Sequence, residues 1–379
     1  MTIYIIVFLT AFFMCRLATP HVKTLAEKIG AIDYPDRRKI HAIPTARMGG
    51  LAIYLGFITA IGVGLLINAP FAKSVSPGFP GFIIGSLIIV ITGILDDTTG
   101  LKPLTKFMGQ FLAATVFLMM ADDTGARVIT NPFGTSSITL PDYLSFIISM
   151  LWIVGIVNAI NFIDGLDGLA NGISFLAAVT LFVVNVRLDQ HFEAFAYLCL
   201  MGSCLGFAGY NEYPAKIFMG DTGSHFLGFS LACLGLLSTT KATTLSVLLI
   251  PLVSLGLPIF DVLIAVIRRS LAGKNIFYPD RRHIHHRLLE KGFTQQEAVR
   301  ILYLFCTCLC IVACIFMNVR DEYATLLAIL TGAIIFSFSS HLKLLWMPPG
   351  SESDIGDNTG RDVSEKSENP TDSSENPEK

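Results

Sequence analysis

Charged residues are scarce in this chain of 379 residues: Asp, Glu, Lys and Arg make up 15% of it, against about 25% in soluble domains. Hydrophobic residues account for 53%, and the mean hydropathy is +0.62. This balance excludes an ordinary soluble domain. The net charge of −2 gives no reason to expect a nucleic-acid partner.

Three other features are missing. The first apolar stretch has no basic region before it and no small-residue cleavage site, so we expect a retained helix rather than a signal peptide. No internal repeat of the kind found in many transporters is evident. The eight cysteines do not form a disulfide framework. Four of them crowd one predicted helix, where we expect packing rather than metal binding: Cys306, Cys308, Cys310 and Cys314.

Long apolar stretches are what the sequence does contain. A bilayer core of roughly 30 Å needs about 20 apolar residues per helix. We therefore predict an all-α polytopic integral membrane protein with about 11 transmembrane helices. The stretches are Ile3–Ala18, Gly49–Ala69, Phe82–Leu95, Leu104–Ala121, Leu144–Ala159, Leu169–Val186, Ala194–Tyr210, Phe226–Leu237, Thr243–Ile267, Ile301–Asn318 and Tyr323–Ser340.

The chain is expected to have two parts. Residues 1–347 form the multi-span catalytic domain, and residues 348–379 form a disordered acidic tail because they are rich in Ser, Glu, Asp, Asn and Pro. Pro251 and Pro258 are expected to bend the ninth span. Thr294 and Glu297 predict a capping box that starts a short amphipathic helix in the loop before the tenth span.

The distribution of basic residues predicts the orientation. If the loops are numbered alternately, those on one side hold seventeen Lys and Arg and those on the other hold five. The positive-inside rule places the basic side in the cytoplasm. The C-terminus and every conspicuous polar motif then lie on the cytoplasmic side of the membrane, and the N-terminus lies outside.

Acidic motifs follow several of the apolar stretches. Asp96 and Asp97 end one stretch, where like charges at a helix C-terminus call for a cationic partner such as Lys106. Asp164 and Asp167 lie three residues apart, and on a helix this spacing would put both carboxylates on one face. Asp221 lies in FMGDTGS, where it is either an N-cap or part of an anion-binding helix start.

A histidine motif, RRHIHHR, contains His283, His285 and His286 beside Arg282. Three imidazoles are able to bind Zn²⁺ or to exchange protons near neutral pH. The neighbouring arginines favour a diphosphate ligand, because guanidinium groups repel a metal ion but bond phosphate in a bidentate way. A solvated loop is the third interpretation.

The oxygen-rich set of acids and amides points to Mg²⁺, with Mn²⁺ as the alternative. Mg²⁺ usually takes one or two carboxylates and fills its other positions with water and substrate phosphates. Most of these acids should therefore position a substrate or accept a proton. This surplus predicts a nucleotide diphosphate substrate rather than a closed structural metal site.

Together the motifs resemble the polyprenyl-phosphate N-acetylhexosamine-1-phosphate transferases, to which phospho-MurNAc-pentapeptide transferase is related. The bacterial members start O-antigen, enterobacterial common antigen, teichoic acid and arabinogalactan synthesis. Six motifs match in order across nearly the whole membrane part: DRRKIH…PTARMGG, ILDD, NAINFIDGLDGLANG, KIFMGDTGS, PIFDVLIAVIRR and PDRRHIHHRLLEKGFTQQEAV. The H-x-H-H form resembles the GlcNAc-1-phosphate branch, and the family also suggests a homodimer.

The resemblance implies a role for each matching residue. Asp221 is implied as the Mg²⁺ ligand, with Asn161 and Asp164 close to the metal and the diphosphate. Further implied roles are uracil contact for Asp167 and Phe218, the base for Asp96 with Asp97 beside it, phosphate contact for Lys106, and the sugar-diphosphate loop for Arg282, His283, His285 and His286. Arg47 matches the first-loop motif, where Ala46 replaces the proline of related sequences.

The implied reaction transfers GlcNAc-1-phosphate from UDP-GlcNAc to a membrane polyprenyl phosphate and releases UMP. UDP-GalNAc, UDP-QuiNAc and UDP-FucNAc are alternative donors, and the sequence does not choose between direct attack and a covalent Asp intermediate. Two functions of other classes are a transporter and a prenyltransferase that uses Asp-rich motifs. The first would place ionisable residues near the midplane, and the second would leave RRHIHHR without a role.

Overall fold

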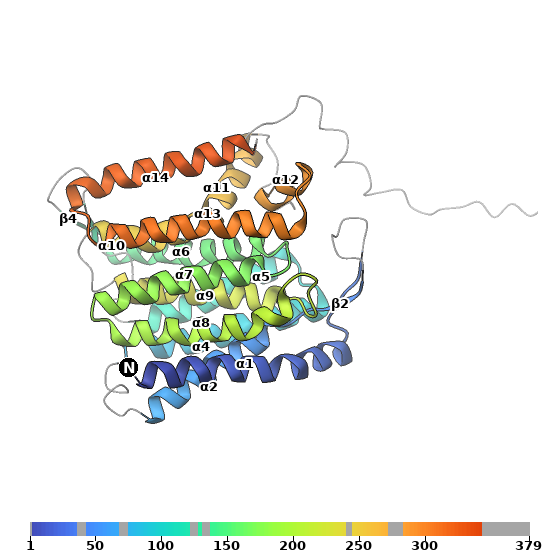
Figure 1. Cartoon of the computed structure of the whole chain (residues 1–379). Helices are drawn as coiled ribbons and strands as arrows, with labels where there is room; N and C mark the ends of the chain where they lie inside the picture. The colour runs from blue at the N-terminus through green and yellow to red at the C-terminus, as the bar shows by residue number, and fades with distance from the viewer. Residues whose placement is uncertain are drawn as a thin grey trace, which may run out of the picture. The chain divides into compact units, whose positions relative to one another are not determined.

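The computed structural model describes residues 2–35, 43–67, 75–121, 128–130, 137–239, 245–271 and 283–342. Thirteen helices are described, and most of them run roughly alongside one another, with α11 and α12 at an angle to the rest (Figure 1). They are α1 (Thr2–Ile29), α2 (Gly50–Ile67), α4 (Phe79–Thr99), α5 (Pro103–Met120), α6 (Asp142–Ile163), α7 (Leu169–Arg187), α8 (His191–Asn211), α9 (Gly220–Thr239), α10 (Leu245–Ser254), α11 (Gly256–Leu271), α12 (Ile284–Glu290), α13 (Gln295–Phe316) and α14 (Asp321–His341). The predicted acidic tail lies outside the described residues.

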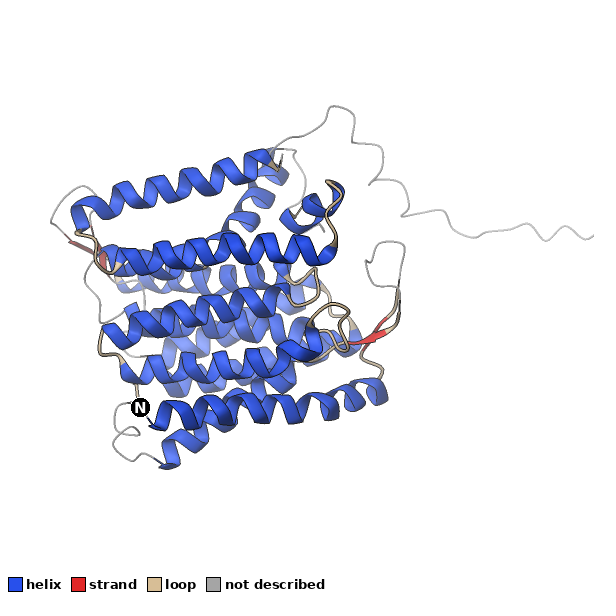
Figure 2. Cartoon of the chain, viewed as in Figure 1, coloured by secondary structure: helices blue, strands red, loops and turns tan. Residues whose placement is uncertain are grey.

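Two short antiparallel sheets lie at opposite ends of the helices (Figure 2). At one end β1 (Ile32–Asp33) pairs with β2 (Thr45–Ala46). At the other end β3 (Val128–Thr130) pairs with β4 (Ser137–Thr139). Helix α12 lies at the same end as β2 (Figure 1).

The predicted all-α membrane architecture is confirmed. Each of the eleven apolar stretches falls on a helix or on the α10–α11 pair. Nine of the described helices are long and apolar enough to cross a membrane, and α9, α10 and α11 are not among them. Helix α9 begins with the polar run Gly-Asp-Thr-Gly-Ser-His, and α10 and α11 are short because the chain turns at Leu255. Pro251 lies inside α10, and Pro258 in the first turn of α11, in line with the predicted bend.

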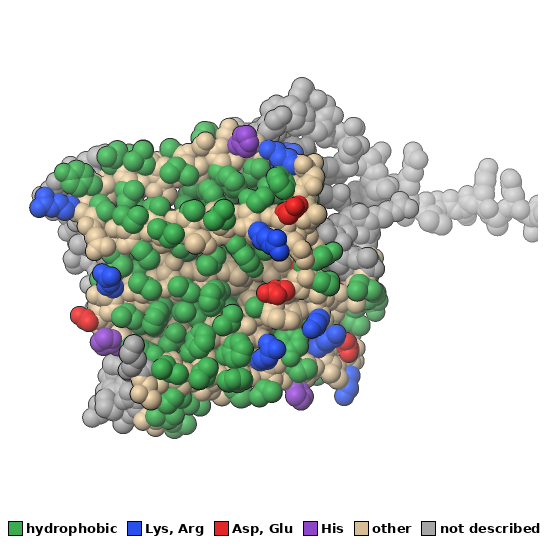
Figure 3. Space-filling view, viewed as in Figure 1, with side chains coloured by type: hydrophobic (Ala, Val, Ile, Leu, Met, Phe, Trp, Pro, Cys, Tyr) green, Lys and Arg blue, Asp and Glu red, His purple; other side chains and the backbone are tan. Residues whose placement is uncertain are grey.

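Apolar side chains cover the lateral surface of the helices. Figure 3 shows them across the middle of one face, with most of the charged side chains near its two ends. Leu151, Leu304 and Ile329 are each at least 60% exposed. Soluble monomers rarely expose a contiguous apolar surface of this extent, so this surface is suited to contact lipid.

Helices α8 and α9 form the interior. In the most apolar 18 residues of α8, 83% are buried. Helix α9 contacts α2, α4, α6, α7 and α8. Helix α4 approaches α9 closely at Gly93, where a Cβ atom would lie 2.4 Å from the Thr222 Cα atom. Small residues allow this approach between membrane helices. It brings the C-terminal end of α4 onto the N-terminal end of α9.

The predicted capping box is present but begins a different element. Thr294 accepts a hydrogen bond from the Glu297 N–H, and the Glu297 carboxylate accepts one from the Thr294 N–H. This box starts α13, a helix of 22 residues, and not a separate short helix. The short helix of this region is α12, which carries part of the histidine motif.

Gly93→Ala tests the close approach of α4 to α9. Overpacking of this kind costs about 1–3 kcal/mol, so we expect a lower midpoint of thermal unfolding in detergent. Gly155→Ala is the matched control, because Gly155 also lies in a membrane helix and a Cβ atom there meets nothing within 4 Å. Equal midpoints for the two variants would contradict the proposed contact.

Candidate active site

Three carboxylates converge where α4 ends and α9 begins. Asp96 and Asp97 come from α4 and Asp221 from the first turn of α9. One oxygen from each lies within 4.8 Å of the others. Among the described residues, this is the group of three or more His, Cys, Asp or Glu side chains that is close enough to share a metal ion. Carboxylate oxygens suit Mg²⁺ or Mn²⁺.

Asp97 holds the start of α9. Its carboxylate accepts hydrogen bonds from the Asp221 N–H at 3.0 Å, the Thr222 N–H at 3.0 Å and the Thr222 hydroxyl at 2.6 Å. These N–H groups belong to the first turn of a helix and have no partner within it. Asp97 therefore acts as an N-cap supplied by another helix. Its predicted catalytic role stays a prediction.

Two cationic side chains offset part of the negative charge of the three carboxylates. The Lys106 ammonium lies 2.6 Å from an Asp96 oxygen and 2.8 Å from an Asp221 oxygen. The Arg47 guanidinium lies 2.9 Å from Asp97 and 3.6 Å from Asp96. The compensation expected for the Asp96–Asp97 pair is thus confirmed. The cluster keeps a net charge of −1, which leaves it attractive to a further cation.

The first loop is bonded directly to the FMGDTGS motif. The Phe218 N–H donates to the Ala46 carbonyl at 2.8 Å, and the Gly49 N–H donates to the Phe218 carbonyl at 2.9 Å. Arg47 and Phe218 form an isolated parallel bridge. These backbone bonds place the Arg47 side chain against the carboxylates, although Arg47 and Phe218 are 171 positions apart in the chain.

Asp164 and Asp167 lie on a turn. The prediction that both belong to one helix face is wrong, because α6 ends at Ile163 and α7 begins at Leu169. Gly168 has a φ of 78°, a left-handed conformation that glycine adopts without strain, and it leads from this turn into α7. Both carboxylates nevertheless line one cavity, and Asp167 accepts a hydrogen bond from the Ala215 N–H at 2.9 Å.

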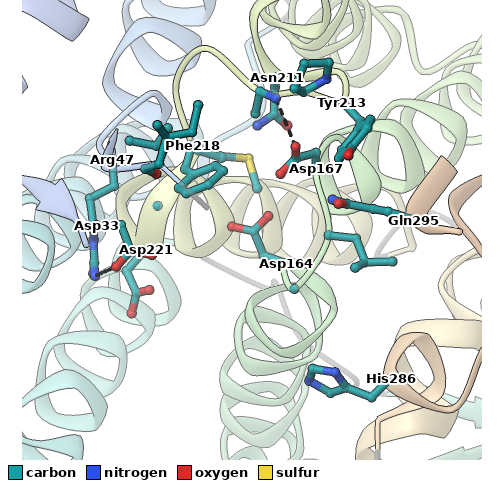
Figure 4. A pocket seen from close by; sticks show the side chains of 18 residues that line it. Asp33, Arg47, Asp164, Asp167, Asn211, Tyr213, Phe218, Asp221, His286 and Gln295 are labelled. Carbon is teal, nitrogen blue, oxygen red and sulfur yellow. Dashed lines mark hydrogen bonds and ion pairs between the residues drawn. The ribbon is translucent and has the colours of Figure 1, made fainter. Parts of the chain in front are cut away.

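This cavity has a volume of about 520 Å³ (Figure 4). In Figure 4, Asp164 lies between the side of Asp221 and Phe218 and the side of Gln295 and His286. The predicted site residues that line the cavity are Arg47, Asp164, Asp167, Phe218, Asp221 and His286. Others lie outside the lining, namely Asp96, Asp97, Lys106, Asn161, His283 and His285, and Arg282 lies outside the described residues.

Burial and neighbouring charge alter the acidity of Asp164. Loss of solvent around its carboxyl group raises the pKa well above its ordinary value, and the carboxylates of Asp221, Asp97 and Asp167 raise it further. Arg47 acts in the opposite direction. A divalent cation near this turn would stabilise the charged form, since an opposite charge favours ionisation.

The histidines divide into two environments. His286 lines the cavity, whereas His283 and His285 are buried, with 6% and 1% of their surfaces exposed. Burial, with the neighbouring His286 and His283, lowers the pKa of His285, so its ring is neutral at pH 7. In the part of the chain that is described, the three imidazoles do not form a metal-binding group, which disfavours the zinc interpretation.

Several residues of the site escaped the sequence analysis. Gln110 and His225 are buried polar residues in α5 and α9, and their side-chain nitrogens lie 3.4 Å apart. His225 also lies 3.8 Å from Asp221. Asn158 of α6 donates a hydrogen bond to Gln110, and Asn161, which the sequence analysis did identify, donates one to Ser224. A polar residue within an apolar membrane helix was the available signal, because such residues are costly in lipid.

Other lining residues carried no signal in the sequence. Asp33, Asn211, Tyr213 and Gln295 come from three separate segments, since Asn211 and Tyr213 both lie where α8 ends, and these segments meet only in the folded chain. Tyr303 of α13 donates a hydrogen bond to the Gly168 carbonyl at 2.7 Å and so holds the turn of Asp164 and Asp167. Gln295 lies within the motif PDRRHIHHRLLEKGFTQQEAV but was given no role from the sequence, and the other residues lie in none of the six motifs.

Comparison with known proteins agrees with this geometry. A profile of glycosyl transferase family 4 matches residues 79–239, which run from α4 to α9. A probable undecaprenyl-phosphate N-acetylglucosaminyl 1-phosphate transferase from Bacillus subtilis is 39% identical over 302 residues, 79% of this chain and 81% of its own. The chain belongs to glycosyl transferase family 4.

Two further relatives show which members of family 4 this transferase is similar to. A decaprenyl-phosphate N-acetylglucosaminephosphotransferase from Mycobacterium tuberculosis is 37% identical over 353 residues, 86% of this chain and 85% of its own. A phospho-N-acetylmuramoyl-pentapeptide-transferase from Thermoanaerobacter is 32% identical over 271 residues, 69% of this chain and 80% of its own. The resemblance inferred from the motifs is confirmed.

Asp97→Asn tests whether Asp97 holds the start of α9 in this transferase. The variant loses the negative charge that pairs with Arg47 and one acceptor oxygen. Hydrogen bonds to charged groups contribute about 1.5–3 kcal/mol each, so the midpoint of thermal unfolding should fall by several degrees. Asp189→Asn is the control, since Asp189 is exposed and its φ of 55° suits asparagine. An unchanged midpoint for Asp97→Asn would refute the capping role.

Proposed function

We propose that this chain transfers GlcNAc-1-phosphate from UDP-GlcNAc to a polyprenyl phosphate in the membrane and releases UMP. The observation that carries the proposal is the union, in one cavity, of Asp221 from the carboxylate–lysine cluster with the aromatic ring of Phe218, a second acidic turn and a histidine. A lipid acceptor explains why such a site is built at the end of membrane helices. The printed activities of the Bacillus and Mycobacterium relatives support the same reaction.

We infer that the metal is Mg²⁺, or Mn²⁺ in its place, and that Asp221 holds it. Asp221 is the member of the carboxylate cluster that lines the cavity, and its side chain is 20% exposed, against 2% for Asp96 and 0% for Asp97. Asp164 lines the same cavity, and Asn161 donates a hydrogen bond to Ser224, three residues after Asp221. The ion would neutralise the diphosphate and orient it.

By the direct route, the reaction is one phosphoryl transfer. An oxygen of the lipid phosphate forms a bond to the β-phosphorus, and the bond from that phosphorus to the bridging oxygen breaks, so UMP leaves with the electron pair. Lys106, between Asp96 and Asp221, is suited to contact phosphate oxygens. Asp96 keeps the nucleophile ionised, and Arg47 and His286 stabilise charge on the transferred group. Phe218 stacks on the uracil, and Asp167 bonds to it.

An exchange experiment separates direct attack from a covalent Asp intermediate. If an aspartate first displaces UMP, labelled UMP is incorporated into UDP-GlcNAc by the lipid-free enzyme. If the lipid phosphate attacks directly, this exchange requires the acceptor. The carboxylates of the cavity are compatible with both routes.

A panel of UDP-N-acetylhexosamines identifies the sugar. UDP-GlcNAc should give the highest kcat/KM, ahead of UDP-GalNAc, UDP-QuiNAc and UDP-FucNAc. A transporter would move a solute across proteoliposomes without cleaving UDP-GlcNAc, so UMP release also decides between the two classes.

We infer that the cavity faces the cytoplasm of a bacterial inner membrane. The support is the excess of Lys and Arg in the loops at its end of the helices. UDP-GlcNAc is hydrophilic and would reach the site from that side. Addition of UDP-GlcNAc to sealed inside-out vesicles should produce UMP, whereas right-side-out vesicles should produce none until they are permeabilised.

Asp221→Asn tests the central part of the site. The purified protein, given UDP-GlcNAc, polyprenyl phosphate and Mg²⁺, should release UMP, and the variant should lose about 100-fold or more of this activity, as expected when a group that stabilises transition-state charge is removed. Asp189→Asn should keep the full activity. Chelation by EDTA should stop the reaction, and added Mg²⁺ should restore it. Wild-type rates in Asp221→Asn would remove the proposed metal role.

A further inference from the structure

A buried carboxylate lies outside the cavity and has no part in the reaction described above. Asp261 is in the second turn of α11 and is 4% exposed. A carboxylate in a membrane helix costs about 2.5–3.5 kcal/mol on insertion scales. A buried charge also needs compensating hydrogen bonds. The contacts that compensate Asp261 therefore indicate its role.

Both oxygens of Asp261 are bonded to the start of the histidine motif. His283 Nδ1 lies 2.8 Å from one oxygen, and because a carboxylate only accepts, this nitrogen carries the proton. The Ile284 N–H donates to the other oxygen at 3.0 Å. Ile284 is the first residue of α12, so Asp261 caps this helix from α11.

A continuous set of contacts leads from Asp261 to the cavity. The His283 ring stacks between Phe162 of α6, at 5.3 Å between centroids, and His285, at 6.0 Å. His285 in turn packs on the turn of Asp164 and Asp167. A Cβ atom on Gly165 would lie 2.2 Å from His285 Nε2, so only glycine permits this contact.

We propose that Asp261 is a positioning residue that fixes the histidine motif so that His286 faces the cavity. Asp261 sets the tautomer and orientation of His283 and the start of α12. The His283–His285 stack then supports the acidic turn, while His286 alone of the three contacts the substrate. The motif is thus divided into a buried supporting pair and one active-site histidine. The claim that His286 contacts the substrate rests on the proposed function, but the placement of the three rings does not.

Histidine modification by diethyl pyrocarbonate, located by mass spectrometry, tests the placement without any activity. In the wild-type protein, His286 should react, and His283 and His285 should be protected. In Asp261→Ala, His283 and His285 should react at least fivefold faster. Glu290→Gln is the matched control, because it removes an exposed ion pair with Arg287 on α12 and should leave the pattern unchanged.

His225 in α9 reports on the fold within the same experiment, since it is 1% exposed and distant in sequence from α12. Continued protection of His225 shows that Asp261→Ala is folded. If His225 becomes reactive in Asp261→Ala, the labelling is repeated with Asp261→Asn, because asparagine retains one acceptor oxygen. Reactive His225 in both variants would overturn the proposal, because Asp261 would then support the whole bundle. Equal reactivity of all three motif histidines in the wild-type protein would also overturn it.

Kinetics give a second readout that partial unfolding does not reproduce. Displacement of His286 should raise the KM for UDP-GlcNAc or lower kcat, with about a tenfold or greater loss of kcat/KM in Asp261→Asn, because small misplacements of catalytic groups are costly. The Mg²⁺ concentration for half-maximal activity should not change. A fall in kcat with an unchanged KM, matched by an equal fall in folded protein, would count against positioning. If the wild-type protein releases no UMP, the proposed function fails, and the labelling result still decides the role of Asp261.

Discussion

The site depends on the hydrogen bonds that the first turn of α9 donates to the Asp97 carboxylate. This carboxylate joins the end of α4, the start of α9 and, through Arg47, the first loop. The N–H groups that it satisfies belong to the turn that carries Asp221. The orientation of Asp221 toward the cavity is therefore set by a second acid that is itself fully buried. The close approach at Gly93 makes this arrangement sterically feasible.

Electrostatics explain why so many acids tolerate one another here. Lys106 and Arg47 leave the Asp96–Asp97–Asp221 cluster one charge short of neutrality, and Asp164 adds another carboxyl group across the cavity. The site is thus attractive to a divalent cation but does not enclose one. An incoming diphosphate would meet both the cation and the basic side chains. A site that offers both a cation and basic side chains suits phosphoryl transfer, in which positioning and charge stabilisation supply most of the catalysis.

The sequence predicted the architecture and much of the site, because apolar stretches and polar motifs are local signals. Asp221, Phe218 and Arg47 were recognised by motif, and the structure brings them to one cavity. The helix assumed for Asp164 and Asp167 was wrong, because α6 ends at Ile163 and the chain turns before α7 begins at Leu169. The separation of His286 from His283 and His285 could not be predicted, since it depends on Asp261, 22 residues before His283 and on another helix. Gln295 and Tyr213 likewise reach the cavity only through tertiary packing.

The most direct test of the account is the position of the metal. A structure of the protein with UDP-GlcNAc and Mn²⁺, with the ion located by anomalous scattering, would show it. The account predicts one Mn²⁺ bound to the diphosphate and to an Asp221 oxygen, with the uracil beside Phe218. The distance to the Asp221 oxygen should be about 2.0–2.2 Å, as for oxygen atoms that bind small divalent cations directly. An ion held by the histidines instead, or a nucleotide bound away from Asp221, would contradict it.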